Sequence, residues 1–178
     1  MENRFKVFET PLPGLLVIQG SKYIDSRGSF ARKYCSRDFS DLRLNSDWHQ
    51  INLSSNTSKG TFRGLHYQKE PFAETKLITC VKGSILDIAV DIREDSPTYT
   101  KYFYLEMYER DELAFYIPNG FAHGYQTLEN GTDVMYLSSN FFDAESECGI
   151  RFDDPLIDIN LPIPISNISA KDSSWPLL

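Results

Sequence analysis

The segment from Gly60 to Arg93 sets polar side chains that can carry charge or protons among apolar, strand-forming residues. It contains Arg63, His66 and Lys76. A β core is built from apolar and β-branched side chains, so the fold itself does not need this polar set. In the strand that holds His66, an ordinary barrel would place valine or isoleucine. The set therefore indicates a functional site, which residues from distant segments must complete.

The histidines allow a metal site as one interpretation. Gly60-x5-His66 and Pro118-x-Gly120-x-x-His123 resemble the two signature segments of the cupin superfamily, which place metal ligands inside a small jelly-roll barrel. A divalent metal needs three or four convergent histidine or carboxylate ligands. Here Gln68 stands where that pattern has a second histidine, and Glu74 lies further along than the pattern requires. The sequence therefore predicts a cupin-like barrel without a catalytic metal or other cofactor. The alternative for His123 is a partly buried histidine bonded to a backbone carbonyl.

Short strands must position these side chains. Alternating apolar and polar residues, bounded by turn signals, predict strands over residues 4–10, 15–18, 29–35, 48–54, 61–68, 76–82, 84–93, 98–107, 113–117, 124–129 and 132–138. One short helix is predicted over residues 38–44, capped by Ser36 or Asp38. Asn130-Gly131, between two predicted strands, indicates a hairpin with a primed turn.

Many short strands at near-regular spacing, without βα alternation, predict an all-β fold. We expect a cupin-type jelly-roll barrel with short peripheral helices, formed by one domain over residues 1–178. After Phe141 the composition shifts to an irregular, proline-containing segment whose aliphatic and aromatic residues need a surface to cover. This predicts an ordered C-terminal tail that wraps back over the barrel.

The overall composition limits the classes of partner that the chain is suited to bind. The 178 residues carry a net charge of −7 and include 12 phenylalanines and 10 tyrosines, which is typical of a folded globular chain. An acidic chain without a basic stripe is a poor candidate for binding nucleic acid or a membrane surface, so a few local cations would have to meet any anionic ligand. Three cysteines without a CxxC pair indicate reduced thiols, and Met1–Lys6 lacks the apolar core of a signal peptide. We therefore expect a cytoplasmic protein.

A wider pattern covers nearly the whole chain in order. Its parts are Asp25-x-Arg27-Gly28-x-Phe30, Gln50-x-Asn52-x-Ser54, Arg63-Gly-Leu-His66-Tyr-Gln68, Asp87-x-Ala-Val-Asp91-x-Arg93-x-x-Ser96-Pro97-Thr98, Gly149-x-Arg151-x-x-Asp154-Pro155 and Ser169-x-Lys171-Asp172. Together they resemble the dTDP-4-dehydrorhamnose 3,5-epimerase family of nucleotide-sugar epimerases. The resemblance implies a metal-free cupin-type barrel, a homodimer that exchanges an N-terminal strand, and inversion of the carbons beside the ketone of a nucleotide-linked 4-keto-6-deoxy sugar.

The resemblance implies four catalytic residues. His66 would be the general base, and Asp172 would orient its imidazole and stabilise it once protonated. Lys76 would stabilise the enolate oxygen. Tyr136 would return a proton on the opposite face of the sugar, which makes the outcome an inversion.

Substrate-binding residues are implied in the same way. Arg27 and Arg63 would hold the diphosphate, because guanidinium forks match phosphate oxygens. Phe30 would stack on the nucleotide base, with the partner subunit as one source of this ring. The full implied set is Arg27, Phe30, Gln50, Asn52, Arg63, His123 and Lys171. Considered singly, Arg27 would be a solvated surface residue and Tyr136 a core residue, so it is the ordered set that favours function.

The two aspartates of the segment share one face of their strand. Because Asp87 and Asp91 alternate with apolar residues, both face the barrel interior or both face solvent. Neither is predicted to be catalytic. A supporting role for Asp87, orienting His66 or Lys76, is a hypothesis.

Two positions depart from the family pattern. Arg32 stands where members that use thymidine often have glutamate, and Leu161 stands where the tail usually has tryptophan. These departures leave open a CDP-linked substrate or the inversion of a single carbon. The alternatives outside this family are a metal-dependent cupin and a catalytically silent sugar-binding module.

Overall fold

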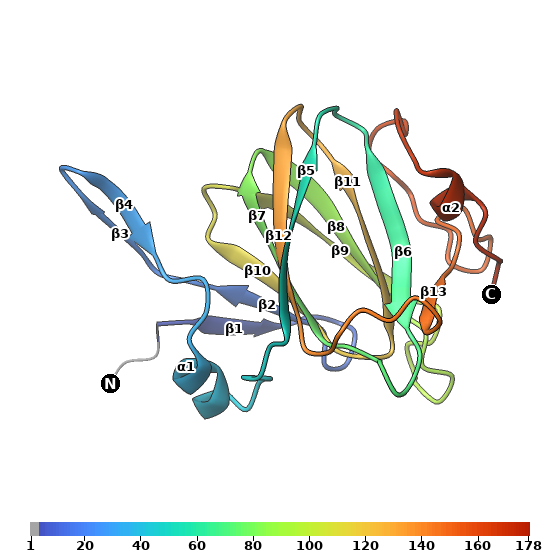
Figure 1. The fold of residues 1–178 in the computed structure, drawn as a ribbon, viewed down its shortest axis with the longest axis horizontal. Helices are drawn as coiled ribbons and strands as arrows, with labels where there is room; N and C mark the ends of the chain where they lie inside the picture. Colours follow the sequence, from blue (N-terminus) through green and yellow to red (C-terminus); the bar gives the residue numbers. More distant parts are fainter. Residues whose placement is uncertain (1–3) are drawn as a thin grey trace.

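The chain folds into two antiparallel β-sheets that face each other, as a computed structural model describing residues 4–178 shows (Figure 1). One sheet has six strands in the order β1-β2-β10-β7-β12-β5, and the other has five in the order β13-β6-β11-β8-β9. The all-β jelly-roll prediction is therefore confirmed. Met1–Asn3, part of the segment judged to lack signal-peptide character, lie outside the described residues. No helix within residues 4–178 is long and apolar enough to cross a membrane.

The strands of these two sheets are short. Those of the six-stranded sheet are β1 (Lys6–Glu9), β2 (Leu16–Gln19), β10 (Leu113–Ile117), β7 (Lys76–Lys82), β12 (Thr132–Ser138) and β5 (Gln50–Asn56). Those of the five-stranded sheet are β13 (Glu147–Gly149), β6 (Phe62–Gln68), β11 (Phe121–Thr127), β8 (Ser84–Asp91) and β9 (Tyr102–Tyr108).

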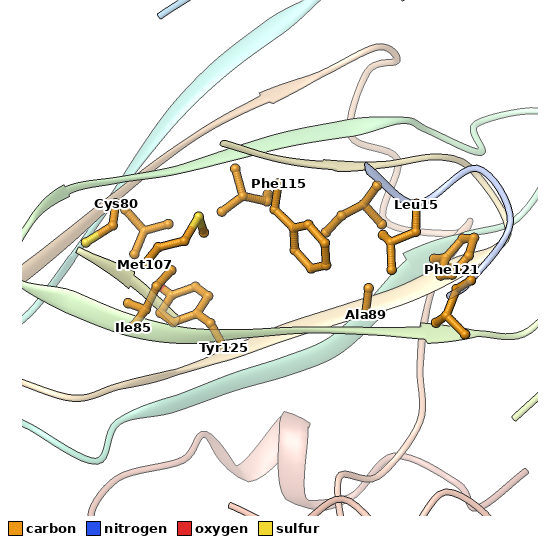
Figure 2. Close-up of a cluster of buried hydrophobic side chains, with 12 residues drawn as sticks. Leu15, Cys80, Ile85, Ala89, Met107, Phe115, Phe121 and Tyr125 are labelled. Carbon is orange, nitrogen blue, oxygen red and sulfur yellow. The ribbon is translucent and has the colours of Figure 1, made fainter. Parts of the chain in front are cut away.

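The main core fills part of the space between the sheets. Figure 2 shows side chains from both sheets meeting there, including Phe115 of β10 and Ile85 of β8, which are both fully buried. Every second residue of each strand points inward, so the period-two pattern of the sequence produces this layer. Burying one such side chain contributes about 1.5–3 kcal/mol. The core therefore holds the sheets at a fixed separation and sets the width of any cleft between them.

Strand β8 is buried along its whole length because both of its faces are covered. Ile85 and Ala89 join the core between the sheets, whereas Ile88 and Val90 join a cluster on the outer face of the five-stranded sheet. The C-terminal tail covers that outer face with Ile157, Ile159, Leu161, Ile165 and Ile168. The predicted ordered tail is thereby confirmed. It carries the short helix α2 (Ala170–Ser173) to the side of β6 (Figure 1).

Helix α1 (Ser36–Asp41) begins and ends earlier than predicted. Its N-cap residue is Cys35, which makes no side-chain capping bond, so the prediction of Ser36 or Asp38 as the cap was wrong. Packing fixes the helix instead, because Phe39 is fully buried and meets the ring of Phe5 edge to face. The helix ends where Arg43 adopts a positive φ of 59°.

The predicted hairpin at Asn130-Gly131 is wrong. Strand β11 before the turn and strand β12 after it lie in different sheets, so the chain crosses between the sheets here. A primed type I′ turn needs positive φ at both central residues, and of these two only Gly131 has it. The Asn130 side chain instead accepts a hydrogen bond from the backbone N–H of Lys59 at 2.7 Å. The turn signal was correct, but it did not specify which strands pair.

A third, two-stranded sheet forms an arm that projects away from the body of the fold (Figure 1). It consists of β3 (Lys22–Asp25) and β4 (Gly28–Ala31), which pair as a hairpin around the predicted turn. At its base Lys22 and Lys33 both form ion pairs with Glu112, the former at 2.9 Å. Because both ends of the hairpin are tied to one carboxylate, the arm has a defined direction.

Candidate active site

A cleft of about 670 Å³ opens between the two sheets. The predicted site residues that line it are Gln50, Asn52, Lys76 and Tyr136 from the six-stranded sheet, Arg63, His66 and His123 from the five-stranded sheet, and Lys171 and Asp172 from the tail. Five strands and the tail, far apart in the sequence, therefore converge on one space. The cleft has one wall in each sheet, and these walls carry different chemistry.

His66 and Asp172 form a hydrogen-bonded pair on one wall. The Nε2 atom of His66 lies 2.7 Å from Oδ1 of Asp172. Asp172 sits in the first turn of α2, where its backbone N–H donates to the cap oxygen of Ser169 at 2.9 Å. The other carboxylate oxygen accepts from the backbone N–H of Gly64 at 3.2 Å. Both carboxylate oxygens are thus held, and the backbone of Asp172 is fixed by the cap, while the imidazole stays about one third exposed to the cleft.

The surroundings of the pair lower the pKa of the Asp172 carboxyl group. Burial alone would raise the pKa of Asp172, but the hydrogen bond and charge of His66 and the N–H of Gly64 outweigh burial, so the pKa lies below its usual range. Asp172 therefore stays ionised beside the imidazole. A carboxylate in this position stabilises the protonated form of the histidine.

Two glycines allow the strands that carry the histidines to come close together. A Cβ atom on Gly64 would lie 2.5 Å from the Cα of Gly124, and one on Gly124 would lie 2.7 Å from the carbonyl oxygen of Arg63. The pairing of β6 with β11 is irregular here, and its register shifts between His123 and Tyr125. As a result His66 and His123 are direct cross-strand neighbours.

His123 has a carboxylate partner of its own. Its Nε2 atom lies 2.6 Å from Oδ1 of Asp87, which is fully buried. Burial raises the pKa of Asp87, although the nearby imidazole opposes this effect.

The hypothesis that Asp87 orients His66 or Lys76 needs correction, because its hydrogen bond goes to His123. The alternative of a backbone carbonyl partner for His123 is likewise replaced by this carboxylate. Asp87 and Asp91 are both buried, so solvent exposure was the wrong alternative for them.

The opposite wall carries Tyr136 and Lys76. Tyr136 lies on β12, between Asn52 of β5 and Ile78 of β7. Burial and, next, the Glu74 carboxylate raise the pKa of its hydroxyl, so Tyr136 keeps its proton in the neutral range. The ammonium group of Lys76 lies 3.2 Å from the Glu74 carboxylate. A proton donor and a cation therefore face the histidine pair across the cleft.

Other predicted residues surround this centre. The Nε–H of Arg63 donates to Asn56 at 2.9 Å, which leaves the rest of its guanidinium to a ligand. The side-chain oxygen of Gln50 accepts from the backbone N–H of Phe142 at 2.6 Å. Lys171 pairs with the Glu147 carboxylate at the edge of the cleft. These cations are suited to an anionic substrate in an otherwise acidic chain.

The structure does not bring Arg27 and Phe30 to the cleft of their own chain. Both lie on the arm, where Arg27 forms a bidentate ion pair with Asp25 and Phe30 is 62% exposed. Arg32 and Leu161 do not line the cleft either. Leu161 packs in the outer cluster of the five-stranded sheet, so its difference from tryptophan does not alter the cleft lining directly.

The position where a metal-binding cupin would have a ligand is used differently. The amide nitrogen of Gln68 donates to the carbonyl oxygens of Phe72 at 2.9 Å and Phe141 at 3.1 Å, and its oxygen accepts from the N–H of Asp143 at 2.7 Å. Gln68 thus ties two loops together. Among residues 4–178 no group of three histidine, cysteine, aspartate or glutamate side chains is placed to hold a metal ion.

Sequence reasoning missed Glu74 as a site residue, because it was considered only as a displaced metal ligand. The signal was present. In extended chain, residues two apart share a face, and Glu74 and Lys76 precede Ile78 and Cys80, which face the core. The alternation therefore indicated that Glu74 points inward.

The comparisons with known proteins identify the family. The family model described as dTDP-4-dehydrorhamnose 3,5-epimerase matches residues 9–178. The dTDP-4-dehydrorhamnose 3,5-epimerase of Sinorhizobium fredii is 39% identical over 167 residues, which cover 91% of this chain and 84% of the relative.

Two solved structures superpose over almost the whole chain. The dTDP-4-dehydrorhamnose 3,5-epimerase of Bacillus anthracis with TDP and PPi bound has a TM-score of 0.94 and 34% identity, covering 98% of this chain and 99% of its own. The dTDP-6-deoxy-D-glucose-3,5-epimerase of Legionella pneumophila in complex with dTDP-4-keto-L-rhamnose has a TM-score of 0.92 and 32% identity, covering 97% and 92%.

Proposed function

Because the chain belongs to the dTDP-4-dehydrorhamnose 3,5-epimerase family, we propose that it inverts C3 and C5 of a dTDP-linked 4-keto-6-deoxyhexose, with dTDP-4-dehydro-6-deoxyglucose as the substrate. This makes it an isomerase of deoxysugar biosynthesis. The observation that carries the proposal is the His66–Asp172 pair, which faces Tyr136 and Lys76 across a cleft with one wall in each sheet.

The first step is removal of a proton next to the ketone. Asp172 accepts a hydrogen bond from Nε2 of His66, which leaves Nδ1 as the proton acceptor. The C–H electrons move into the C–C bond as an enolate forms, and its oxygen acquires negative charge that the Lys76 ammonium stabilises. The carboxylate of Asp172 stabilises the imidazolium that results.

The second step returns a proton to the opposite face. The Tyr136 hydroxyl lies on the wall opposite His66, so its proton reaches the carbon from the other side and inverts it. The tyrosinate then regains a proton and the imidazolium loses one, both by exchange with solvent. C3 and C5 both flank the C4 ketone, so the same groups serve both carbons in turn.

The proposal extends to a homodimer. The arm places Arg27 and Phe30 outside the cleft of their own chain, with Phe30 and Ile24 largely exposed. Exchange of arms between two chains would supply the guanidinium to the diphosphate and the ring to the nucleotide base in the neighbouring cleft. Large apolar side chains on a projecting hairpin are typical of a segment that packs against a partner.

We also propose the cytoplasm as the compartment. The support is the state of the three cysteines, which are free thiols at Cys35, Cys80 and Cys148.

Incubation in D2O tests the function. With dTDP-4-dehydro-6-deoxyglucose we expect deuterium at both C3 and C5, because each inversion brings in a solvent-derived hydrogen. The His66→Ala variant should lose about 10²–10⁴-fold in exchange rate at both carbons. Exchange at one carbon only would assign a single-carbon epimerase, and a preference for the CDP-linked sugar would revise the nucleotide.

Two further outcomes would overturn the proposal. If no keto sugar gains deuterium, and if the His66→Ala variant keeps full biological activity, the chain is a binding module instead. Loss of exchange on chelation, with stoichiometric iron, zinc or manganese in the purified chain, would assign a metal-dependent cupin.

A further inference from the structure

Glu74 and Lys76 form an ion pair in the wall of the cleft. The proposed mechanism gives a role to Lys76 but none to Glu74. Their charged groups are 3.2 Å apart, and their side chains are only 10% and 12% exposed. Both residues line the cleft. A carboxylate so shielded from water is costly unless it is paired, and placing a negative charge near a developing enolate carries a further cost. We therefore expect the Glu74 carboxylate to have a function in the site.

The backbone fixes the direction in which this pair points. Thr75, between the two residues, donates from its N–H to the hydroxyl of Ser139 at 2.8 Å and accepts from the N–H of Ser139 at 3.0 Å. These bonds continue the pairing of β7 with β12 beyond the end of the strand. Because Thr75 is anchored in extended geometry, Glu74 and Lys76 both point into the cleft.

The same pairing places Tyr136 beside the ion pair. Lys76 is opposite Ser138, and Tyr136 is opposite Ile78, so Lys76 and Tyr136 are diagonal neighbours across two strands. Such neighbours have Cα atoms roughly 7–8 Å apart, within reach of long side chains. Glu74 lines the same cleft as both groups, and its carboxylate pairs with the Lys76 ammonium.

We propose that Glu74 is a positioning residue, which holds the Lys76 ammonium on the cleft wall and keeps a negative charge beside the Tyr136 hydroxyl. This inference rests on the proposed function, in which Lys76 stabilises the enolate and Tyr136 supplies the returning proton. A lysine side chain has four rotatable bonds, so an anchored carboxylate reduces the number of positions that its ammonium adopts.

The charge of Glu74 also acts on the proton of Tyr136. Burial is the larger cause of the raised pKa of Tyr136, and Glu74 adds to it. Tyr125 and Glu147 act in the same direction, whereas Arg63 lowers this pKa. Removing the Glu74 charge should therefore make Tyr136 lose its proton at a lower pH.

The first test compares Glu74→Gln with Glu145→Gln. Both remove one negative charge, but Glu145 is exposed on the loop before β13 and does not line the cleft. For Glu74→Gln we expect kcat to fall about tenfold with little change in KM, and the alkaline limb of the kcat profile to move down by roughly half to one pH unit. Glu145→Gln should change neither quantity. An unchanged alkaline limb in Glu74→Gln would overturn the inference.

The second test does not need turnover. The tyrosinate absorbance of the chain, minus that of Tyr136→Phe, gives the titration of Tyr136 alone. The same difference taken with Glu74→Gln present should titrate at lower pH. If this shift is found while the unaltered chain exchanges no deuterium with any keto sugar, the proposed function fails but the electrostatic coupling stands. If exchange is normal and the titration does not move, the inference about Glu74 fails alone.

Discussion

At the scale of single residues, the site depends on partners that hold each reactive group. His66 can act as a base because Asp172 fixes one of its nitrogen atoms, and Ser169 and Gly64 in turn hold Asp172 in place. Tyr136 is useful as an acid because burial and a nearby carboxylate keep its proton in place. The pattern of polar residues in the sequence indicated these reactive groups. It did not indicate Asp87 as the partner of His123, because that choice depends on strand register. The alternation of residues did place Glu74 on the same face as Lys76, but Glu74 had been considered only as a metal ligand.

Asp172→Asn should impair the chemistry without unfolding the chain. The amide can keep the contact with His66 but carries no charge and favours the wrong tautomer, so we expect kcat to fall by about 10²–10⁴-fold. Circular dichroism and the thermal midpoint should stay near those of the unaltered chain. Deuterium exchange at C3 and C5 measures the effect. A loss of less than threefold would mean that His66 does not depend on this carboxylate.

At the scale of elements, the strands were predictable and their pairing was not. Strands β7, β10 and β12 begin and end at the predicted residues, because Lys76–Lys82, Leu113–Ile117 and Thr132–Ser138 have clear flanking turn signals. The turn before β12 was taken for a hairpin because its local sequence suits one. Crossing between sheets is decided by which apolar faces meet in the core, and a four-residue window does not contain that information.

The loop after β8 is held by a buried carboxylate. Asp91 accepts hydrogen bonds from Arg93 at 2.7 and 2.8 Å and from the hydroxyls of Ser96 at 2.6 Å and Thr98 at 2.7 Å. Burial alone would raise the pKa of Asp91, but these bonds outweigh it and lower the pKa to about 2. A carboxyl group whose pKa is lowered by folding contributes stability above its unfolded value of roughly 4, and loses that contribution as pH falls toward the folded value.

Asp91→Asn should therefore destabilise the chain in a pH-dependent way. We expect the free energy of unfolding to fall by about 2–3 kcal/mol at neutral pH, because the variant loses the charge on the buried group that accepts hydrogen bonds from Arg93, Ser96 and Thr98. The difference from the unaltered chain should shrink as pH falls from roughly 4 to 2. Urea unfolding at several pH values measures this, with the exposed neighbour Asp95→Asn as the control. A difference that is constant across this range would contradict the assignment.

At the scale of the whole molecule, one chain gathers most but not all of the predicted site. The two sheets and the tail bring catalytic residues from residues 66 to 172 together, and the core between the sheets fixes their separation. The arm points elsewhere, and its Arg27 and Phe30 stay in solvent. Sequence order could suggest that these residues belong to the site. The family resemblance, and not the order of the residues, implies that a partner chain receives them.

Mixing two inactive variants distinguishes exchange of arms from use of a chain's own arm. If Arg27→Ala and His66→Ala are each inactive, a mixed dimer contains one cleft with an intact His66 and a partner arm with an intact Arg27. After random reassociation we expect activity to return to about one quarter of that of the unaltered dimer. The unmixed variants, taken through the same dissociation and reassociation, are the controls. No recovery despite proven mixed dimers would show that arms do not complete neighbouring clefts.

The ion pairs at the base of the arm have a consequence for how two chains would meet. Lys22 and Lys33 fix the hairpin to Glu112 within a single chain, so its direction is set before any encounter. Ordering a flexible segment at the moment of association costs free energy and slows productive collisions. An arm that is already oriented avoids most of that cost. Assembly is then the docking of two preformed surfaces. Its rate depends on collision frequency and not on the folding of the arm.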